Sequence, residues 1–162
     1  MSEFADIRLR PSSPADEPFL FAVYASTRAE ELAVTGWPEQ VKTAFCHQQS
    51  TAQHAHYRQH YPGTEYLIIE HGGTPAGRLY IDRCPDEIRI IDIALLPAHR
   101  GHGIGTHLLT EIIAEGKASQ RPVTIHVERM NPALRLYERL GFRMKEDQGI
   151  YLFMARPPDD PT

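Results

Sequence analysis

Residues 88–106 read Ile-Arg-Ile-Ile-Asp-Ile-Ala-Leu-Leu-Pro-Ala-His-Arg-Gly-His-Gly-Ile-Gly-Thr, and this stretch decides the fold. Its first part, Ile88–Leu96, is rich in isoleucine and leucine and predicts a strand. After a glycine-dense turn, apolar residues recur at helical spacing from about Gly103 to near Gly116. The stretch therefore predicts a strand, a tight turn and an amphipathic helix in direct succession.

The turn Arg100–Gly105 has the composition of an anion-binding loop. Glycines leave the backbone N–H groups uncovered, and the positive end of the following helix favours a negative charge. A phosphate cradle is one interpretation, and a tight turn without a ligand is the other. The pattern is neither GxGxxG nor a loop that ends in Gly-Lys-Ser/Thr, so it matches neither of those phosphate-loop templates.

The segments before this stretch predict one strand, two helices and two further strands. Short apolar and tyrosine-rich runs joined by turn residues indicate an antiparallel meander that ends in Ile88–Leu96. Proline and acidic residues mark helix starts, and apolar residues at helical spacing follow them. The segments are residues 5–10 for the first strand, Pro14 or Pro18 to about Thr27 and Pro38 to Pro62 for the helices, and Tyr66–Glu70 and Gly77–Asp82 for the later strands.

Beyond the stretch, Val123–Glu128 and Ile150–Ala155 predict two more strands. Between them, Asn131 is expected to cap a short helix with Pro132 in its first position and Gly141 past its end. The expected fold class is α/β or α+β, with a mixed, mostly antiparallel sheet of six to seven strands flanked by about four helices. We expect one domain over residues 1–156 and a flexible tail rich in proline and aspartate over residues 157–162.

Composition narrows the class of protein. The chain has 162 residues, 41% of them hydrophobic, and a net charge of −4, which suits one globular domain and disfavours nucleic acid as the main partner. No apolar run approaches the roughly 18 residues of a membrane span, and residues 1–6 lack the features of a secretory signal. We therefore expect a cytoplasmic protein with no membrane partner. Cys46 and Cys84 are far apart and are interpreted as ordinary thiols.

Three motifs occur in order along the chain: the strand Asp92–Pro97, the loop Arg100-x-x-Gly103-x-Gly105, and the segment Asn131–Phe142 with its Tyr-x-x-x-Gly-Phe ending. In this combination the sequence resembles the GNAT superfamily of acyl-CoA-dependent N-acyltransferases. The resemblance implies a sheet that is splayed near its fourth and fifth strands. It also implies acetyl-CoA as co-substrate, no metal, and direct transfer of the acetyl group to a primary amine in a ternary complex.

The resemblance assigns cofactor contacts to two segments and one further residue. The loop amides would hold the pyrophosphate of coenzyme A, and the fourth strand would pair with the pantetheine arm. The Leu95 amide would face the thioester oxygen and stabilise the oxyanion. The residues concerned are Arg100, Gly101, His102, Gly103, Ile104, Gly105 and Thr106 for the pyrophosphate, Ile93, Ala94 and Leu95 for the pantetheine arm, and Asn131 for a contact with the pantetheine or the thiolate.

Catalytic groups are assigned by the same resemblance. Tyr137 would act as general acid toward the leaving thiolate, although helical spacing alone also fits a place on a buried stripe. Arg89 stands where several relatives have a catalytic glutamate, and an arginine is no base. His126 matches another family position and could accept a proton near neutral pH, or it could be a structural histidine. Asp92 and Glu128 are weaker candidates, since each could simply pair with an arginine.

The acceptor pocket is expected near the first two helices. Glu30, Glu31 and Trp37, together with Asp92, would suit a cationic amine, although adjacent acids at a helix end also fit a solvated face. The acceptor would be a small-molecule amine, a protein N-terminus or a lysine, and relatives of this type are often homodimers. His54, His56 and His60 do not share one helical face, so we expect no metal site there.

A second hypothesis is a non-catalytic acyl-CoA-binding sensor or interaction module that keeps the fold without turnover. Arg89 at the position of a catalytic glutamate favours this hypothesis, and Tyr137 favours the enzyme.

Overall fold

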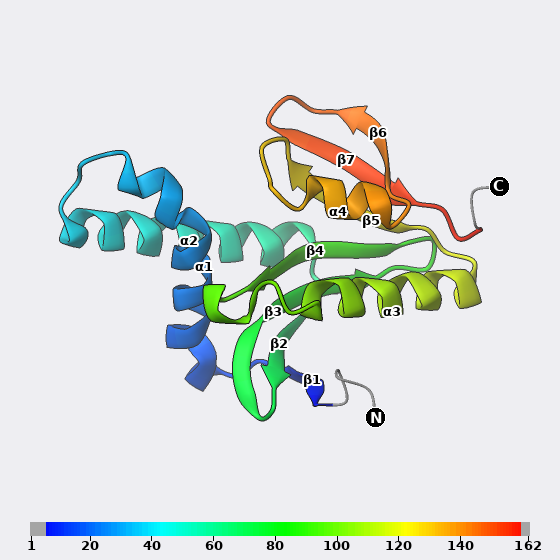
Figure 1. Cartoon of the computed structure of the whole chain (residues 1–162), viewed down its shortest axis with the longest axis horizontal. Coiled ribbons are helices and arrows are strands. Elements are labelled where there is room, and N and C mark those ends of the chain that lie inside the picture. The colour runs from blue at the N-terminus through cyan, green and yellow to red at the C-terminus, as the bar shows by residue number, and fades with distance from the viewer. Residues whose placement is uncertain (1–5, 160–162) are drawn as a thin grey trace.

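The strands form one sheet because the first four follow each other as antiparallel neighbours and the last three add beyond them. The computed structural model describes residues 6–159 and has a seven-stranded sheet in the order β1-β2-β3-β4-β5-β7-β6 (Figure 1). The strands are β1 (Ile7–Pro11), β2 (Glu65–His71), β3 (Thr74–Arg83), β4 (Ile88–Leu95), β5 (Val123–Glu128), β6 (Arg143–Asp147) and β7 (Tyr151–Arg156).

Helices cover both faces of the sheet. One face packs against α3 and α4, through a core that joins Leu109 and Tyr137 to Ile90 and Val127. The other face packs against α1 and α2, where Leu20 and Tyr57 meet Tyr80. The helices are α1 (Glu17–Ala33), α2 (Glu39–His60), α3 (Ile104–Ser119) and α4 (Leu134–Arg139), with short 3-10 turns at Pro14–Asp16 and Pro97–His99.

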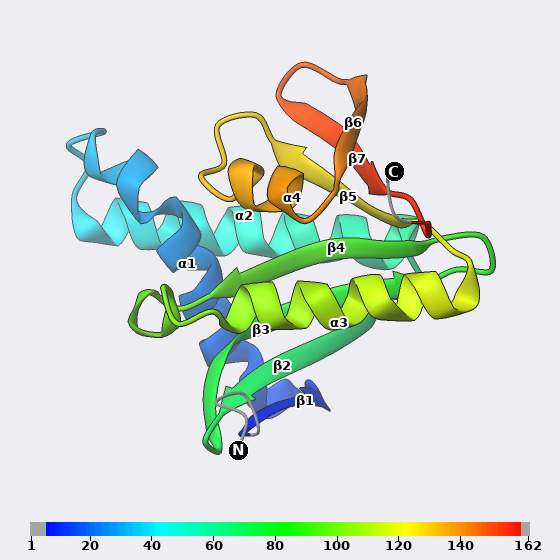
Figure 2. The ribbon, with the colours of Figure 1, turned by 45° about the vertical axis from the view of Figure 1, so that its right-hand side comes forward.

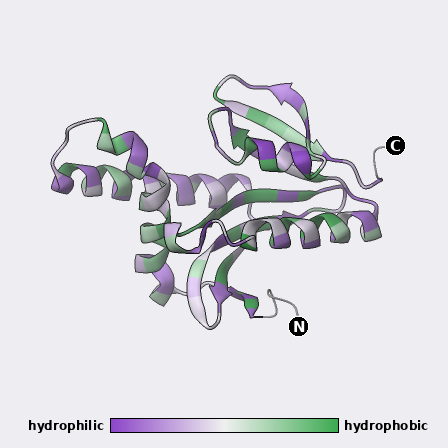
Figure 3. Ribbon diagram, viewed as in Figure 1, coloured by the Kyte–Doolittle hydropathy of each residue, from purple (hydrophilic) through white to green (hydrophobic). Residues whose placement is uncertain are grey.

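The hydropathy of the helices agrees with these positions. Figure 3 shows α2 as mostly hydrophilic, whereas the central strands are mostly hydrophobic. In the part of the chain that the structure describes, no helix is both long enough and apolar enough to cross a membrane.

The expected fold class is confirmed, with seven strands and four α-helices over residues 6–159, but several boundaries differ. Helix α1 continues to Ala33 instead of ending near Thr27, because Leu32 packs into a small core with Tyr24 and Cys46. Helix α3 passes through Gly116 and ends at Ser119. Gly116 serves close packing, since a Cβ there would lie 2.7 Å from the Arg121 carbonyl oxygen.

Other differences from the expected boundaries lie around α4 and β6 and at the two ends of the chain. Helix α4 begins at Leu134, and the Asn131 side chain instead accepts a hydrogen bond of 2.8 Å from the Ala133 N–H in the preceding turn. Strand β6 has no period-2 hydrophobic signal, because all of its residues are exposed. The first expected strand begins at residue 5, and residue 5 and tail residues 160–162 lie outside the described part. At the start of the tail, Arg156 donates to the carbonyl oxygens of Pro157 and Asp159.

The central pair of strands separates partway along its length. Strands β4 and β5 are parallel and pair only from Ile88↔Val123 to Ile90↔Ile125. Just beyond this point the β3–β4 register shifts, so that Tyr80 faces Asp92, Ile81 faces Ile90, and Ile91 is left as an extra residue. Such a bulge bends a strand and increases its twist. Figure 2 shows β4 and β5 close together at one end and far apart at the other.

The bulge also exchanges the two faces of β4. Before it, Ile88 and Ile90 pack toward α3, and after it Ile93 and Leu95 do so. Ile91 instead packs with Tyr80 on the face covered by α1 and α2. Since side chains alternate strictly along a regular strand, the extra residue is what brings Ile93 and Leu95 to the α3 face.

Close approach of β3 and β4 holds the end of β4 in place. Gly77 pairs with Leu95, and a Cβ on Gly77 would lie 2.2 Å from the Ala94 carbonyl oxygen and 2.9 Å from the Leu95 Cα. Both atoms belong to the backbone, so they can move only if β4 moves. Glycine at this position therefore sets the distance between the two strands.

We expect Gly77→Ala to lower the free energy of unfolding by about 1–3 kcal/mol, the usual cost of overpacking. Chemical denaturation would measure this loss. Gly63→Ala is the control, because its Cβ would meet only the movable Asp82 carboxylate, at 3.1 Å. Equal stability of the two variants would contradict the role assigned to Gly77.

Candidate functional site

A cleft of about 50 Å³ opens where β4 and β5 diverge. Residues from β4, β5 and the α4 segment surround it, and five of them are candidates from the sequence. The lining residues are Ile91, Asp92, Ile93, Ile125, His126, Val127, Asn131 and Tyr137. The structure thus brings together Asp92, Ile93, His126, Asn131 and Tyr137, which lie up to 45 positions apart in the chain (137 − 92 = 45).

The edge of β4 that faces this divergence carries backbone N–H groups without a strand neighbour. The Leu96 N–H donates to the Ala76 carbonyl oxygen, and the Ala94 carbonyl oxygen lies against Gly77, so both residues point their polar groups toward β3. Because backbone polar groups alternate along a strand, those of Ile93 and Leu95 point the other way. Their N–H groups face the space that β5 has left.

The start of α3 provides a second set of donors. Gly101 and Gly103 have φ values of 78° and 80°, which let the loop turn sharply into the helix. The first intrahelical bond runs from the His107 N–H to the Gly103 carbonyl oxygen. The N–H groups of residues 104–106 therefore have no carbonyl of their own helix to bond. Since residues 104–107 include no acid, this helix end is suited to an external anion.

The side chains of the loop residues Arg100, His102 and Thr106 point elsewhere or into solvent, whereas the backbone N–H groups lie at the helix start. Arg100 turns back, and its Nε donates to the Leu95 carbonyl oxygen at 2.9 Å. Its Nη2 lies 3.4 Å from Ser26 Oγ in α1. His102 and Thr106 are exposed.

Tyr137 approaches the cleft from the α3–α4 side of the sheet. The residue is 4% exposed, and its ring meets Phe142 edge to face, with 5.7 Å between ring centroids. Burial, and then the charge of Asp92, raise the pKa of Tyr137 to about 12. The hydroxyl therefore stays protonated at neutral pH and can donate a hydrogen bond.

His126 approaches from the opposite face. Its neighbours Ile125 and Val127 point into the core with α3, so strand alternation turns His126 toward the side of α1 and α2. Its ring lies against Phe153 at 4.8 Å between centroids. Desolvation, and then the charge of Arg89, lower the pKa of His126, so the imidazole is neutral at pH 7.

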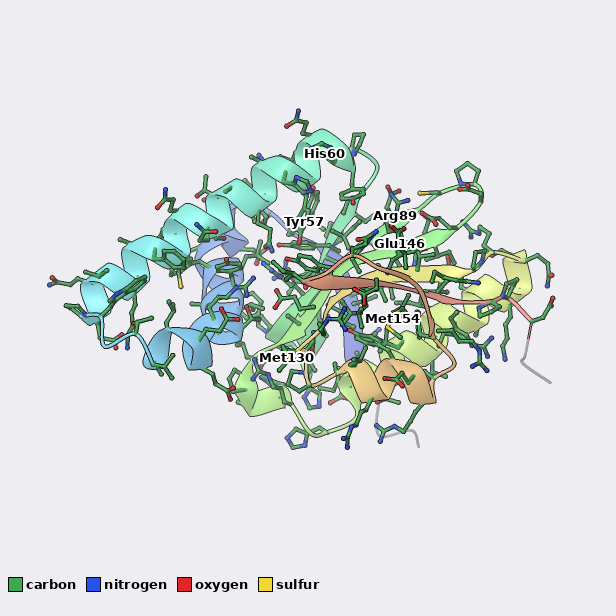
Figure 4. The ribbon with its side chains drawn as sticks, turned by 90° about the horizontal axis from the view of Figure 1, so that it is seen from above. Tyr57, His60, Arg89, Met130, Glu146 and Met154 are labelled. Carbon is green, nitrogen blue, oxygen red and sulfur yellow. The ribbon has the colours of Figure 1, made fainter. Side chains whose placement is uncertain are left out.

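Arg89 and Glu146, both labelled in Figure 4, also influence the charge of His126. Arg89 pairs with Glu87 and lies over the ring of Tyr61, at 5.1 Å from its centroid. The residue at the position of a catalytic glutamate is thus held in an ion pair beside the aromatic ring at the end of α2.

Asp92 is held by a buried arginine, Arg78, that is not among the residues predicted from the sequence. Arg78, 2% exposed, lies with its Nη2 2.5 Å from Asp92 Oδ2 and donates to Gln53 of α2. Its guanidinium also lies 4.9 Å from the centroid of the Tyr80 ring. The signal in the sequence is an arginine within the apolar run Gly77–Ile81, since a buried cation needs an acidic partner.

The acidic residues of the first helix are paired or exposed. Glu31 bonds to Arg28 at 3.1 Å, and Arg28 also reaches Glu128 at the end of β5, at 3.4 Å. Glu30 is exposed. Trp37 packs edge to face on Phe45, with 5.5 Å between centroids, in the connection of α1 and α2 at the left of Figure 1. None of Glu30, Glu31 and Trp37 is therefore among the residues that line the cleft.

The histidines of α2 have aromatic neighbours. His54 lies 3.0 Å from the Tyr80 hydroxyl through its Nε2, and the rings of His56 and His60 are 4.3 Å apart. Figure 4 shows Tyr57 on the side of α2 that faces the sheet and His60 at the end of the helix. Over residues 6–159, no group of three or more His, Cys, Asp or Glu side chains could hold a metal ion.

Comparison with known proteins agrees with this geometry. The profile of the family described as "Acetyltransferase (GNAT) family" matches residues 27–142. A mycothiol acetyltransferase of Nocardia farcinica is 40% identical over 87 residues, which are 51% of this chain and 27% of that protein. The match therefore spans little more than a quarter of the length of this relative.

Solved structures share the fold over nearly the whole chain. The PaiA N-acetyltransferase of Thermoplasma acidophilum, in complex with coenzyme A, has a TM-score of 0.68 and 18% identity, with 97% of this chain and 99% of that one covered. A GNAT family acetyltransferase of Elizabethkingia anophelis with acetyl-CoA bound has a TM-score of 0.60 and 15% identity, with 94% and 99% covered.

We expect Gly105→Glu to reduce coenzyme A affinity at least tenfold without unfolding the protein. A Cβ at Gly105 meets no atom within 4 Å, and a carboxylate in the first turn favours the helix itself, so the new charge opposes only an incoming phosphate. Calorimetric titration and thermal unfolding would measure the two effects. Ala114→Glu, on an exposed position of the same helix, should bind as the wild type does. If Gly105→Glu bound coenzyme A as tightly as the wild type, the phosphates could not bind at this helix end.

Proposed function

Since this chain belongs to the acetyltransferase (GNAT) family, we propose that it transfers the acetyl group of acetyl-CoA to a primary amine by direct attack within a ternary complex. The observation that carries the proposal is the open edge of β4. Its free N–H groups lie between the uncapped start of α3 and the hydroxyl of Tyr137. A phosphorylated thioester requires donors for its phosphates, for its amide-containing arm and for its leaving sulfur, and these groups supply them.

In this proposal the backbone does most of the cofactor binding. The N–H groups of residues 104–106 hold the pyrophosphate, and the free edge of β4 pairs with the amides of the pantetheine arm. The Leu95 N–H donates to the carbonyl oxygen of the thioester, where negative charge develops during attack. Asn131, which also lines the cleft, lies beside the sulfur end of the arm.

Two side chains on opposite faces handle protons. The neutral His126 accepts the proton of the amine, directly or through water, and Tyr137 donates to the leaving sulfur. A thiol with an ordinary pKa of about 8.5 is a stronger acid than Tyr137 with a pKa of about 12. Tyr137 therefore stabilises the thiolate mainly by a hydrogen bond, and the proton does not have to cross completely.

The acceptor enters from the side of α1 and α2, where Asp92, Glu128 and Glu31 supply negative charge. Arg78 pairs with Asp92, and Arg28 is shared by Glu31 and Glu128, so these three carboxylates have two arginines among them and one carboxylate charge is left for an ammonium (3 − 2 = 1). Both small-molecule amines and protein amines fit this balance.

Binding and turnover test the proposal separately. Calorimetry measures acetyl-CoA binding, and release of free coenzyme A in the presence of an amine panel measures transfer. Acetylation of at least one amine is the expected result. Tight binding without transfer to any amine would instead support the acyl-CoA sensor, which Arg89 at the expected position of a catalytic glutamate also favours.

Tyr137→Phe should lower kcat by about 10²-fold, the lower end of what a general acid contributes, because only the hydroxyl is removed. Its acetyl-CoA affinity should remain within about twofold of wild type. Steady-state kinetics measures kcat, and calorimetry measures the affinity for acetyl-CoA. Tyr61→Phe, at the end of α2, is the matched control. An unchanged kcat in Tyr137→Phe would exclude the proposed role.

The pH dependence should report on His126. Its lowered pKa means that the base is protonated, and the rate lost, only as the pH falls below 6.5, the ordinary value. In His126→Gln, kcat should drop, and the remaining rate should no longer decrease as the pH falls below 6.5. This decrease is the acidic limb of the pH–rate profile. His56→Gln, on the exposed face of α2, should retain the wild-type profile. If the limb survives in His126→Gln, another group or the acceptor itself is the base.

A further inference from the structure

Arg100 belongs to the loop beside the phosphate site, yet its guanidinium points away from the start of α3. Its Nε donates to the carbonyl oxygen of Leu95, the last residue of β4, and its Nη2 approaches Ser26 Oγ in α1. A single 3-10 turn, Pro97–His99, brings Arg100 back over the strand that it follows. This geometry differs from that of a side chain extended toward a phosphate.

The Leu95 carbonyl lies on the edge of β4 that β5 has left. A regular strand neighbour would donate an N–H group to it, but the β4–β5 pairs end at Ile90↔Ile125. Within residues 6–159, Arg100 Nε takes the place of that missing donor. A hydrogen bond from a charged group is stronger than one from an amide, so it fixes the Leu95–Leu96 peptide firmly.

This contact also removes an electrostatic conflict. The N–H and the carbonyl of Leu95 point to the same edge, where the acetyl oxygen must approach the N–H. An uncovered carbonyl there would repel an oxygen that gains negative charge. With its lone pair engaged by Arg100, the carbonyl no longer opposes that charge.

Helix α1 completes the arrangement by contacting both sides of the divergence. Ser26 donates to the Val23 carbonyl oxygen at 2.7 Å, which leaves its oxygen lone pairs to accept from Arg100. Just along the helix, Arg28 bonds to Glu128 of β5. The helix that borders the acceptor side is therefore connected to β4 through Arg100 and to β5 through Arg28.

We propose that Arg100 is a positioning residue that substitutes for the absent strand neighbour of Leu95 and aligns the Leu95 amide with the acetyl oxygen, while backbone amides alone hold the phosphates. This inference rests on the proposed function, because it takes acetyl-CoA as the bound thioester. It predicts that the position requires a hydrogen-bond donor at the place of Nε rather than a positive charge.

Three substitutions of Arg100 distinguish a requirement for a hydrogen-bond donor from a requirement for a positive charge. In Arg100→Gln, the amide nitrogen lies as many bonds from Cα as Arg Nε and can donate to Leu95 without a charge. In Arg100→Lys, the charge is kept but lies one bond farther out. Arg100→Met retains an apolar side chain of similar length but has neither a hydrogen-bond donor nor a positive charge.

We expect all three variants to bind coenzyme A within about threefold of wild type, with the same salt dependence. Arg100→Met should lose about 10²-fold in kcat, the cost of misplacing a reacting group by about 1 Å, and Arg100→Gln should recover most of it. In hydrogen exchange, the Leu96 amide, which shares its peptide with the Leu95 carbonyl, should exchange at least tenfold faster in Arg100→Met and near the wild-type rate in Arg100→Gln.

The opposite pattern would overturn the inference: coenzyme A affinity kept in Arg100→Lys but reduced tenfold in both Arg100→Gln and Arg100→Met, with unchanged Leu96 exchange. That result would make Arg100 a phosphate ligand. Failure of the wild-type protein to bind coenzyme A would instead overturn the proposed function. Since hydrogen exchange needs no acceptor, the positioning role is tested even before the amine is known.

Discussion

The site depends on the early end of the pairing between β4 and β5. Two parallel strands that stay paired would satisfy each other's backbone groups and leave nothing for a ligand. Here the bulge at Ile91 turns β4 away after Ile90↔Ile125, so the N–H groups of Ile93 and Leu95 face open space instead of a strand neighbour. The cleft, the free donors and the two faces from which side chains approach all follow from that one irregularity.

Charged side chains compensate for what the sheet no longer provides. Arg78 holds Asp92 under the cleft, Arg28 connects α1 to Glu128, and Arg100 covers the Leu95 carbonyl. Arg78 does so in a buried region, where an unpaired carboxylate would cost free energy, whereas Arg28 and Arg100 make their contacts nearer the solvent. The opening between the strands is thus kept by arginines at its floor and its rim.

Much of the fold could be predicted from the sequence, because glycine spacing and hydrophobic periodicity act locally. The strand, loop and helix around Arg100 are of this kind, as is the helix that carries Tyr137. The bulge could not be predicted, since Ile90 and Ile91 are both apolar and conceal the change of face. The Arg78–Asp92 pair depends on strand register, which periodicity does not give. Trp37 was expected near the acceptor, but α1 continues to Ala33, about 9 Å farther than predicted, and carries the connection away from the cleft.

The extra residue in β4 also bears on how such a sequence can change over time. Removing one residue between Ile90 and Ile93 would restore regular alternation with Ile93 still turned toward α3, because the extra residue itself would be gone. What would be lost is the bend that separates β4 from β5, and with it the open edge of β4. Changes of length should therefore be confined to turns such as Gly72–Gly73 and Gly149, where positive φ values mark reversals of the chain. The length of β4 is as fixed as any residue in it.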